Sequence, residues 1–231
     1  MCGRYSLIKP SDVLSKRFKV QIDEAFKPHY NAAPGQTMPV ITNKRPTHFS
    51  MFHWGLIPNW SLDDKISSNL INARAETILT KSPFKQGIKT HRCLIPADGF
   101  YEWKKQGKEK VPYRITLADD EAFSFAGLWD SWEDEKGEII NSFTIITTTP
   151  NELVMDIHQR MPVILPKDAE QRWLNDNITD QEIVSLLKPY DSSKMYAYKT
   201  HKSVNSASFD HPECIQPAPK FYPGETLNLF E

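Results

Sequence analysis

Cysteine is scarce in this chain, with only Cys2, Cys93 and Cys214 among 231 residues. An odd number at such wide spacing predicts neither a disulfide framework nor a zinc site, and it favours the reducing cytoplasm. No apolar run is long enough to cross a membrane and no signal-peptide core follows Met1, so we expect no membrane partner. Motifs of phosphate-binding loops, dinucleotide folds, zinc peptidases and serine hydrolases are also missing, and we expect no metal and no cofactor.

An excess of either charge is missing too, because 28 basic and 29 acidic residues leave a formal net charge of -1. No long-range basic field attracts nucleic acid, so any anion-binding site must be local. With 39% hydrophobic residues, no internal repeat and no convincing linker, the composition is that of a globular chain with a substantial core. We expect one domain over residues 1–231, acting as a monomer.

Short segments rich in β-branched and aromatic residues dominate the first two thirds of the chain, with turn residues between them. They predict strands at Met38–Thr42, Phe49–Gly55, Arg92–Pro96, Gly99–Lys105, Tyr113–Leu117, Phe123–Trp132 and Ser142–Thr148. Helical signals are fewer, and no regular βαβ alternation is present. The pattern predicts an α+β fold built on a mostly antiparallel sheet.

Three segments predict helices. Val13, Leu14 and Phe18 share one face of Ser11–Phe18. A capping box at residues 149–152, with proline at the first helical position, predicts a helix that ends near His158. A second capping box at residues 179–182 predicts a helix that ends before a proline at position 189.

Cys2 directly follows the start methionine, and removal of Met1 would give it a free α-amine beside its thiol. Such a 1,2-aminothiol condenses with an aldehyde to an imine and then closes to a five-membered thiazolidine. The α-amine titrates near about 8 and the thiol near about 8.5, so both have a reactive fraction at neutral pH. The alternative is a terminal cysteine without a role.

Two internal segments place single polar groups in apolar surroundings. Asn72 and Arg74 offer an amide and a planar cation suited to phosphate, although Ile71–Thr77 could instead begin an amphipathic helix with an exposed salt bridge. Glu102 lies among aromatic residues, where partial desolvation would raise its pKa toward general acid–base use. The alternative is a carboxylate that faces water from an edge strand. Cys93, nearby, fits a small core residue.

His158 lies at the expected end of a helix, a place that favours the imidazolium form, and Arg160 could hold a phosphate. The alternative for His158 is a capping role only. Trp54 fits core packing, whereas Trp60 follows a Pro-Asn turn and could stack on a base. Basic clusters at Lys81, Lys85, Lys89 and Arg92, and at Lys104, Lys105, Lys108 and Lys110, fit solvated faces.

Taken in order, these segments resemble the SRAP (SOS response-associated peptidase) family, which includes the bacterial YedK-like abasic site processing proteins. The matching stretches are MCGRYS, YNAAPGQ, WGLIPNW, INARAET, RCLIPADGFYEWKK, FAGLWDSW, ITTTPNELVMDIHQRMPVIL and, more loosely, SVNSASFDHPE. The resemblance implies a barrel-like arrangement of β-strands flanked by helices, with a positively charged groove for single-stranded DNA. It also implies covalent capture of abasic sites through the N-terminal cysteine.

The resemblance further implies a role for individual residues of this chain. Cys2 is the nucleophile, Asn72 orients its terminus, Glu102 is the acid–base group, and His158 assists imine chemistry and its reversal. Positions that contact phosphate or line the groove are matched by Arg4, Pro34, Trp60, Arg74, Trp103, Thr148 with its two neighbouring threonines, and Arg160. Ser61 departs from the pattern, which allows a second aromatic residue after Trp60.

Two other functions use the same residues. In the first, Cys2 is the nucleophile of a cysteine peptidase that also releases its own Met1, an activity that the family resemblance includes. In the second, the chain binds single-stranded DNA without covalent chemistry, and the cysteine is idle.

Overall fold

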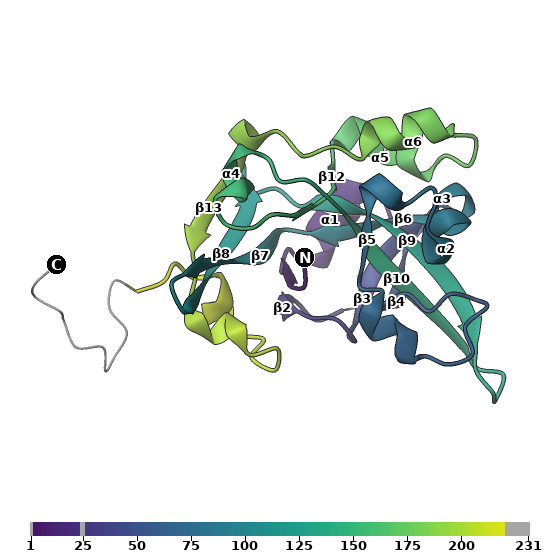
Figure 1. Cartoon of the computed structure of the whole chain (residues 1–231), viewed down its shortest axis with the longest axis horizontal. Helices are drawn as coiled ribbons and strands as arrows, with labels where there is room; N and C mark the ends of the chain where they lie inside the picture. Colours follow the sequence, from purple (N-terminus) through teal and green to yellow (C-terminus); the bar gives the residue numbers. More distant parts are fainter. Residues whose placement is uncertain (1, 24–25, 220–231) are drawn as a thin grey trace, which may run out of the picture.

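Five long strands close into a barrel, which lies on the right of Figure 1. The structure is a computed structural model, and it describes residues 2–23 and 26–219. Around the barrel the order is β10 (Ile139–Thr148), β4 (Arg45–Trp54), β3 (Thr37–Thr42), β6 (Arg92–Ala97) and β9 (Phe123–Glu133), which pairs again with β10. Neighbours are antiparallel except β10 and β4. Shorter strands β5 (Asn72–Arg74), β11 (Met161–Pro162) and β12 (Ile164–Leu165) extend it.

A second, fully antiparallel sheet lies on the left of Figure 1. Its order is β13 (Met195–Lys199), β8 (Glu109–Leu117), β7 (Gly99–Gln106), β1 (Tyr5–Leu7) and β2 (His29–Ala32). Only Asp98 separates β6 of the barrel from β7 of this sheet. The two sheets are therefore continuous along the chain at this corner.

Helices are short and surround the strands. They are α1 (Ser11–Phe18), α2 (Ser82–Lys85), α3 (Gly87–Thr90), α4 (Glu152–Met155), α5 (Lys167–Leu174) and α6 (Asp180–Leu186). Single 3-10 turns occur at η1 (Lys65–Asn69), η2 (Ala75–Thr77), η3 (Ser192–Lys194), η4 (Lys202–Asn205) and η5 (Pro212–Ile215). Within the described ranges, none of these helices has the length and apolar character needed to cross a bilayer.

The α+β class and the mostly antiparallel pairing confirm the sequence prediction, and each of the seven predicted strands is present. The capping box at residues 179–182 is also confirmed at the start of α6. The box at residues 149–152 is wrong, because the side chain of Asn151 rather than that of Thr149 caps α4 by accepting from Val154 N. Since α4 ends at Met155, His158 lies beyond the helix instead of at its last turn.

Aromatic side chains join the two sheets. Tyr5 of β1 is fully buried, and its ring centroid lies 5.1 Å from that of Trp54 and 5.7 Å from that of Phe125. Such tilted and edge-to-face contacts stabilise the fold by more than the burial of their apolar area alone would give. They fix the strand that follows Cys2 against the barrel wall.

Asp98 fixes the same strand by hydrogen bonds. Its carboxylate accepts from Ser6 Oγ (2.7 Å), from the backbone N–H of Ile8 (2.5 Å) and from Arg114 (3.2 Å). A side chain at Gly99 would displace the Arg114 guanidinium, because a Cβ there would lie 2.7 Å from it. A buried carboxylate that accepts this many hydrogen bonds is held firmly in place. It therefore fixes the position of β1 next to β7.

Candidate active site

Cys2 is fully buried just before β1. The Sγ of Cys2 lies 3.9 Å from the carbonyl oxygen of Arg4, and Asn72 Nδ2 donates to the carbonyl oxygen of Cys2 at 2.9 Å. Burial, and after it the negative charge of Glu102, raises the pKa of the Cys2 thiol far above its ordinary value. The sulfur is therefore a neutral thiol at physiological pH.

Asn72 reaches Cys2 because β5 runs parallel to β10 with Asn72 opposite Ile145. Asn72–Arg74 is thus a strand and Ala75–Thr77 a single 3-10 turn, so the alternative of an amphipathic helix that begins in Ile71–Thr77 is wrong. Its Oδ1 is buried, and no hydrogen-bond donor in the described part of the chain reaches it. One end of the amide holds the Cys2 backbone, and the other end is available to a bound molecule.

Glu102 and His158 are a titratable pair in the candidate site. Glu102 lies in β7 with its side chain 3% exposed, and its Oε2 is 3.7 Å from His158 Nδ1. Burial raises the pKa of Glu102 to about 7, so the prediction of a desolvated carboxyl is confirmed and the water-facing alternative is wrong. Burial lowers the pKa of His158, which keeps this imidazole neutral near pH 7.

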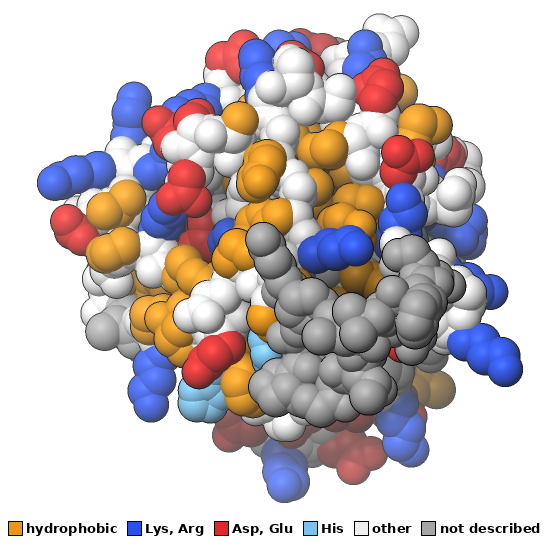
Figure 2. Space-filling view, turned by 90° about the vertical axis from the view of Figure 1, so that its left-hand side faces the viewer, with side chains coloured by type: hydrophobic (Ala, Val, Ile, Leu, Met, Phe, Trp, Pro, Cys, Tyr) orange, Lys and Arg blue, Asp and Glu red, His pale blue; other side chains and the backbone are white. Residues whose placement is uncertain are grey.

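These two groups open into a pocket of about 650 Å3 that Trp103, Lys105, Lys110 and Asn205 also line. The indole Nε1 of Trp103 donates to Asn205 Oδ1 at 2.7 Å, which joins β7 to η4. The turn of the β7–β8 hairpin lies at the left of Figure 1. Figure 2, which views the molecule from that side, shows Lys and Arg side chains dispersed around the face rather than gathered in one field.

The three arginines of the predicted phosphate sites differ in how far protein partners occupy them. Arg160 forms a fork with Glu76 (2.5 and 3.0 Å) and donates to the Thr147 carbonyl at 2.7 Å. Arg4 donates to Asn31 Oδ1 (3.0 Å) and to a carbonyl of η4 (2.8 Å). Arg74 is exposed at the end of β5.

Two other predicted groove residues, Thr148 and Pro34, lie outside the pocket at Glu102. Thr148 is buried, and its hydroxyl donates to the Leu187 carbonyl at 3.3 Å, so its side chain stabilises the fold, whereas Thr149 is exposed. Pro34 lies in the turn between β2 and β3 and is half-buried. Neither lines the pocket at Glu102.

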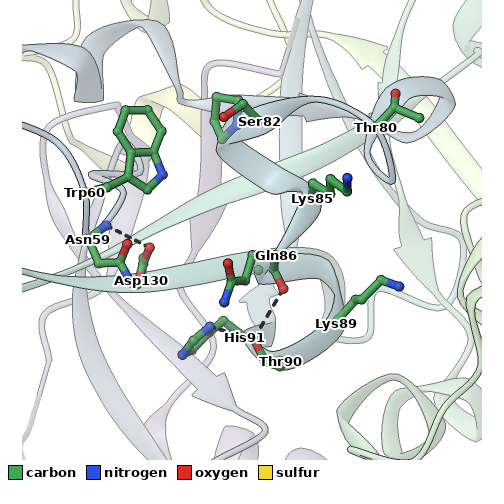
Figure 3. A pocket seen from close by; sticks show the side chains of 12 residues that line it. Asn59, Trp60, Thr80, Ser82, Lys85, Gln86, Lys89, Thr90, His91 and Asp130 are labelled. Carbon is green, nitrogen blue, oxygen red and sulfur yellow. Dashed lines mark hydrogen bonds between the residues drawn. The ribbon is translucent and has the colours of Figure 1, made fainter.

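Trp60 lines a separate hollow of about 850 Å3 that shares no lining residue with the Glu102 pocket. Figure 3 shows its indole on the side opposite Lys85 and Lys89. Its loop is fixed where Asn59 N donates to Asp130 at 2.9 Å, and the side chain is 56% exposed, as the sequence predicts. A base stacked on Trp60 would therefore lie outside the pocket that holds Glu102.

Comparison with known proteins relates this arrangement to one family. The family model described as SOS response associated peptidase (SRAP) matches residues 1–207. The chain belongs to the SRAP family. Abasic site processing proteins YoqW and YoaM of Bacillus subtilis (strain 168) are 43% and 44% identical to this SRAP protein, over 94% and 93% of its length and 99% and 97% of theirs.

More distant relatives share the same core. Abasic site processing protein HMCES of Gallus gallus is 33% identical over 83% of this SRAP chain and 67% of its own. A crystal structure of a protein from Bacteroides thetaiotaomicron superimposes with a TM-score of 0.88 at 34% identity and covers 94% of this chain and 100% of its own. The resemblance seen in the eight sequence segments is therefore confirmed.

Several residues of the SRAP site were missed from the sequence or given no role. Glu76 is the carboxylate partner of Arg160, and Asn205 forms a wall of the pocket. Lys105 and Lys110 were assigned to a solvated face, yet both line the pocket. The sequence signal that could have paired Lys105 with Lys110 is their equal distance from the hairpin turn, because such residues face each other across the two strands.

Proposed function

We propose that this SRAP protein processes abasic sites in single-stranded DNA by forming a covalent thiazolidine through Cys2 once Met1 has been removed. Met1 lies outside the described residues, so its removal stays a prediction. The observation that carries the proposal is the placement of the Cys2 backbone on Asn72, with Glu102 and His158 3.7 Å apart beside it. The names of the bacterial and avian relatives support abasic sites as the substrate.

The reaction joins an aldehyde, an amine and a thiol with loss of one water. The α-amine of Cys2 attacks C1′ of the ring-opened abasic sugar, and the resulting carbinolamine loses water to give an imine. The thiol sulfur then bonds to the same carbon, and its proton passes to the nitrogen. An imine alone permits β-elimination and strand cleavage, whereas the closed ring removes the imine and protects the strand.

The acid–base centre suits both halves of this reaction. With a pKa of about 7, Glu102 can give a proton to the departing hydroxyl and take one from the amine or thiol at the same pH. Neutral His158 can relay a proton to or from the sugar oxygen as the ring opens. A raised thiol pKa supports an order in which the amine attacks first and the sulfur closes the ring second.

The direct experiment mixes processed protein with an oligonucleotide that carries one abasic site. We expect a protein–DNA band that survives denaturing electrophoresis and an intact mass that equals protein plus DNA minus one water. An oligonucleotide with a reduced abasic sugar, which has no aldehyde, is the matched control. No denaturation-resistant band from protein whose mass shows that Met1 is absent would overturn the proposal.

Glu76 gives a prediction about DNA affinity. Its carboxylate competes with phosphate for the Arg160 guanidinium, so Glu76→Gln should free this cation and tighten binding to single-stranded DNA by about tenfold, the value of one charged hydrogen bond. Fluorescence anisotropy at low salt measures the effect. Adding Arg160→Gln to Glu76→Gln should abolish the gain, and a gain that persists would assign it to another cause.

Peptidase chemistry at the same cysteine is the second proposal, and the description of the family as a peptidase favours it. A buried thiol that stays protonated is a weak nucleophile toward a peptide carbonyl, so we place this activity below crosslinking. Self-release of Met1 predicts that Cys2→Ala retains Met1, whereas an external aminopeptidase removes it from both proteins because both second residues are small. Intact mass distinguishes the two routes.

A further inference from the structure

The β7–β8 hairpin carries two lysines that face each other. Lys105 of β7 lies directly opposite Lys110 of β8 in the register of the antiparallel pair. Like charges at directly opposed positions destabilise a sheet, because their Cβ atoms lie only about 5 Å apart. An anion between or above such a pair would reduce this repulsion.

No acidic residue in the described ranges supplies that anion through an ion pair with either lysine. Glu109, the nearest acid along the strand, lies opposite Gln106 instead. Both lysines are exposed at the end of the hairpin. Their repulsion is therefore reduced only by solvent and salt.

The pair also lies at the mouth of the pocket that holds the reaction groups. Lys105 and Lys110 line the same hollow as Glu102 and His158, with Trp103 between the lysines and the acid–base centre along β7. An anion bound by the two ammonium groups would therefore lie in the same hollow as a molecule seated at Glu102.

Two of the three arginines near the site are already occupied by protein partners. Glu76 neutralises Arg160 through a bidentate ion pair, and Arg4 is hydrogen-bonded to Asn31 and to the chain at η4. Burial also lowers the pKa of Arg4, a sign that its charge is costly where it lies. The two lysines, by contrast, combine an unsatisfied charge with a position on the pocket rim.

We propose that Lys105 and Lys110 together bind one phosphate diester of the DNA strand next to the abasic sugar. This inference rests on the proposed function, because it takes the strand at Glu102 to be the source of the phosphate. Two flexible ammonium groups can both bind a monoanionic phosphate diester, and its negative charge reduces their mutual repulsion. The hairpin is then a phosphate-binding arm that holds the lesion over Cys2.

The test measures binding to single-stranded DNA without a lesion, so that no covalent step contributes. Lys105→Gln with Lys110→Gln is compared with Lys104→Gln with Lys108→Gln, two lysines of the same hairpin that do not line the pocket. We expect the first double variant to bind about tenfold more weakly, the effect of one charged contact. The slope of log K against log salt should decrease by about 0.7 for one phosphate contact. Equal slopes and affinities for the two double variants would overturn the inference.

A charge reversal separates phosphate binding from hairpin stability. Lys110→Glu creates a cross-strand ion pair with Lys105, so the protein should unfold at a higher temperature while binding DNA more weakly than Lys108→Glu, which changes the net charge equally. Improved stability with DNA affinity equal to that of Lys108→Glu would overturn the inference.

The covalent reaction reports on the two proposals separately. At equal, low concentrations of abasic-site DNA, the variant with Lys105→Gln and Lys110→Gln should form the crosslink more slowly than the variant with Lys104→Gln and Lys108→Gln, because it binds the strand more weakly. If the unmodified protein forms no crosslink, the proposed function fails, whereas an unaltered salt slope in a crosslinking protein refutes the role of the lysines alone.

Discussion

Cys2→Ala protein is expected to lose completely the DNA adduct that survives denaturation, while it still forms an imine. After Met1 is removed the α-amine is present, but no sulfur can close the ring. Borohydride reduces an imine to a stable secondary amine, so a covalent band should appear only after this treatment. Because the imine persists, cleavage of the abasic strand should increase relative to the unmodified protein.

Cys214→Ala is the matched control for this experiment. Cys214 is also a buried free thiol, but it packs against Tyr101 and Val204 in a separate cluster. It should give the full denaturation-resistant adduct without borohydride. If Cys2→Ala also gave that adduct without reduction, the sulfur would not be part of the link and the thiazolidine would be wrong.

Glu102→Gln has the second large effect, and it acts in opposite directions on activity and stability. Loss of a positioned acid–base group should slow crosslinking by about 10²–10⁴-fold. The native protein holds the Glu102 proton up to a pKa of about 7, so unfolding releases it between about pH 4.5 and pH 7. Native stability therefore decreases as pH rises through this window, by about 3 kcal/mol when complete.

Glutamine carries no charge, and so Glu102→Gln escapes this cost. We expect urea unfolding to give similar free energies for both proteins near pH 4.5 and a more stable variant at pH 8, by up to about 3 kcal/mol. Glu109→Gln, which changes an exposed carboxyl in the neighbouring strand, should leave both the rate and the pH dependence unaltered. A variant that is less stable than the unmodified protein at pH 8 would show that the Glu102 charge is satisfied in the fold.

Local sequence patterns predict the long strands because each strand contains enough β-branched and aromatic residues to give a recognisable strand pattern. Strands of two to four residues, such as β5 and β11, have no measurable period, and they form only because β10 offers an open edge. The parallel pairing of β10 with β4 and β5 is likewise decided by barrel closure. The misplaced cap at Thr149 arises because Thr149 and Asn151, on either side of Pro150, can both cap a helix, and the folded structure uses Asn151.

The sequence by itself determined the chemistry that is possible: a thiol and a latent α-amine on one residue, a carboxyl among aromatics, and the ordered segments of the SRAP family. Only the tertiary structure decided how those groups are tuned. Folding buries Glu102 and places it 3.7 Å from His158, and it pairs Arg160 with Glu76. In both pairs the two residues are more than fifty positions apart in the sequence. The free energy of a charge depends on desolvation and on the distance to other charges, and both quantities exist only once the chain has folded.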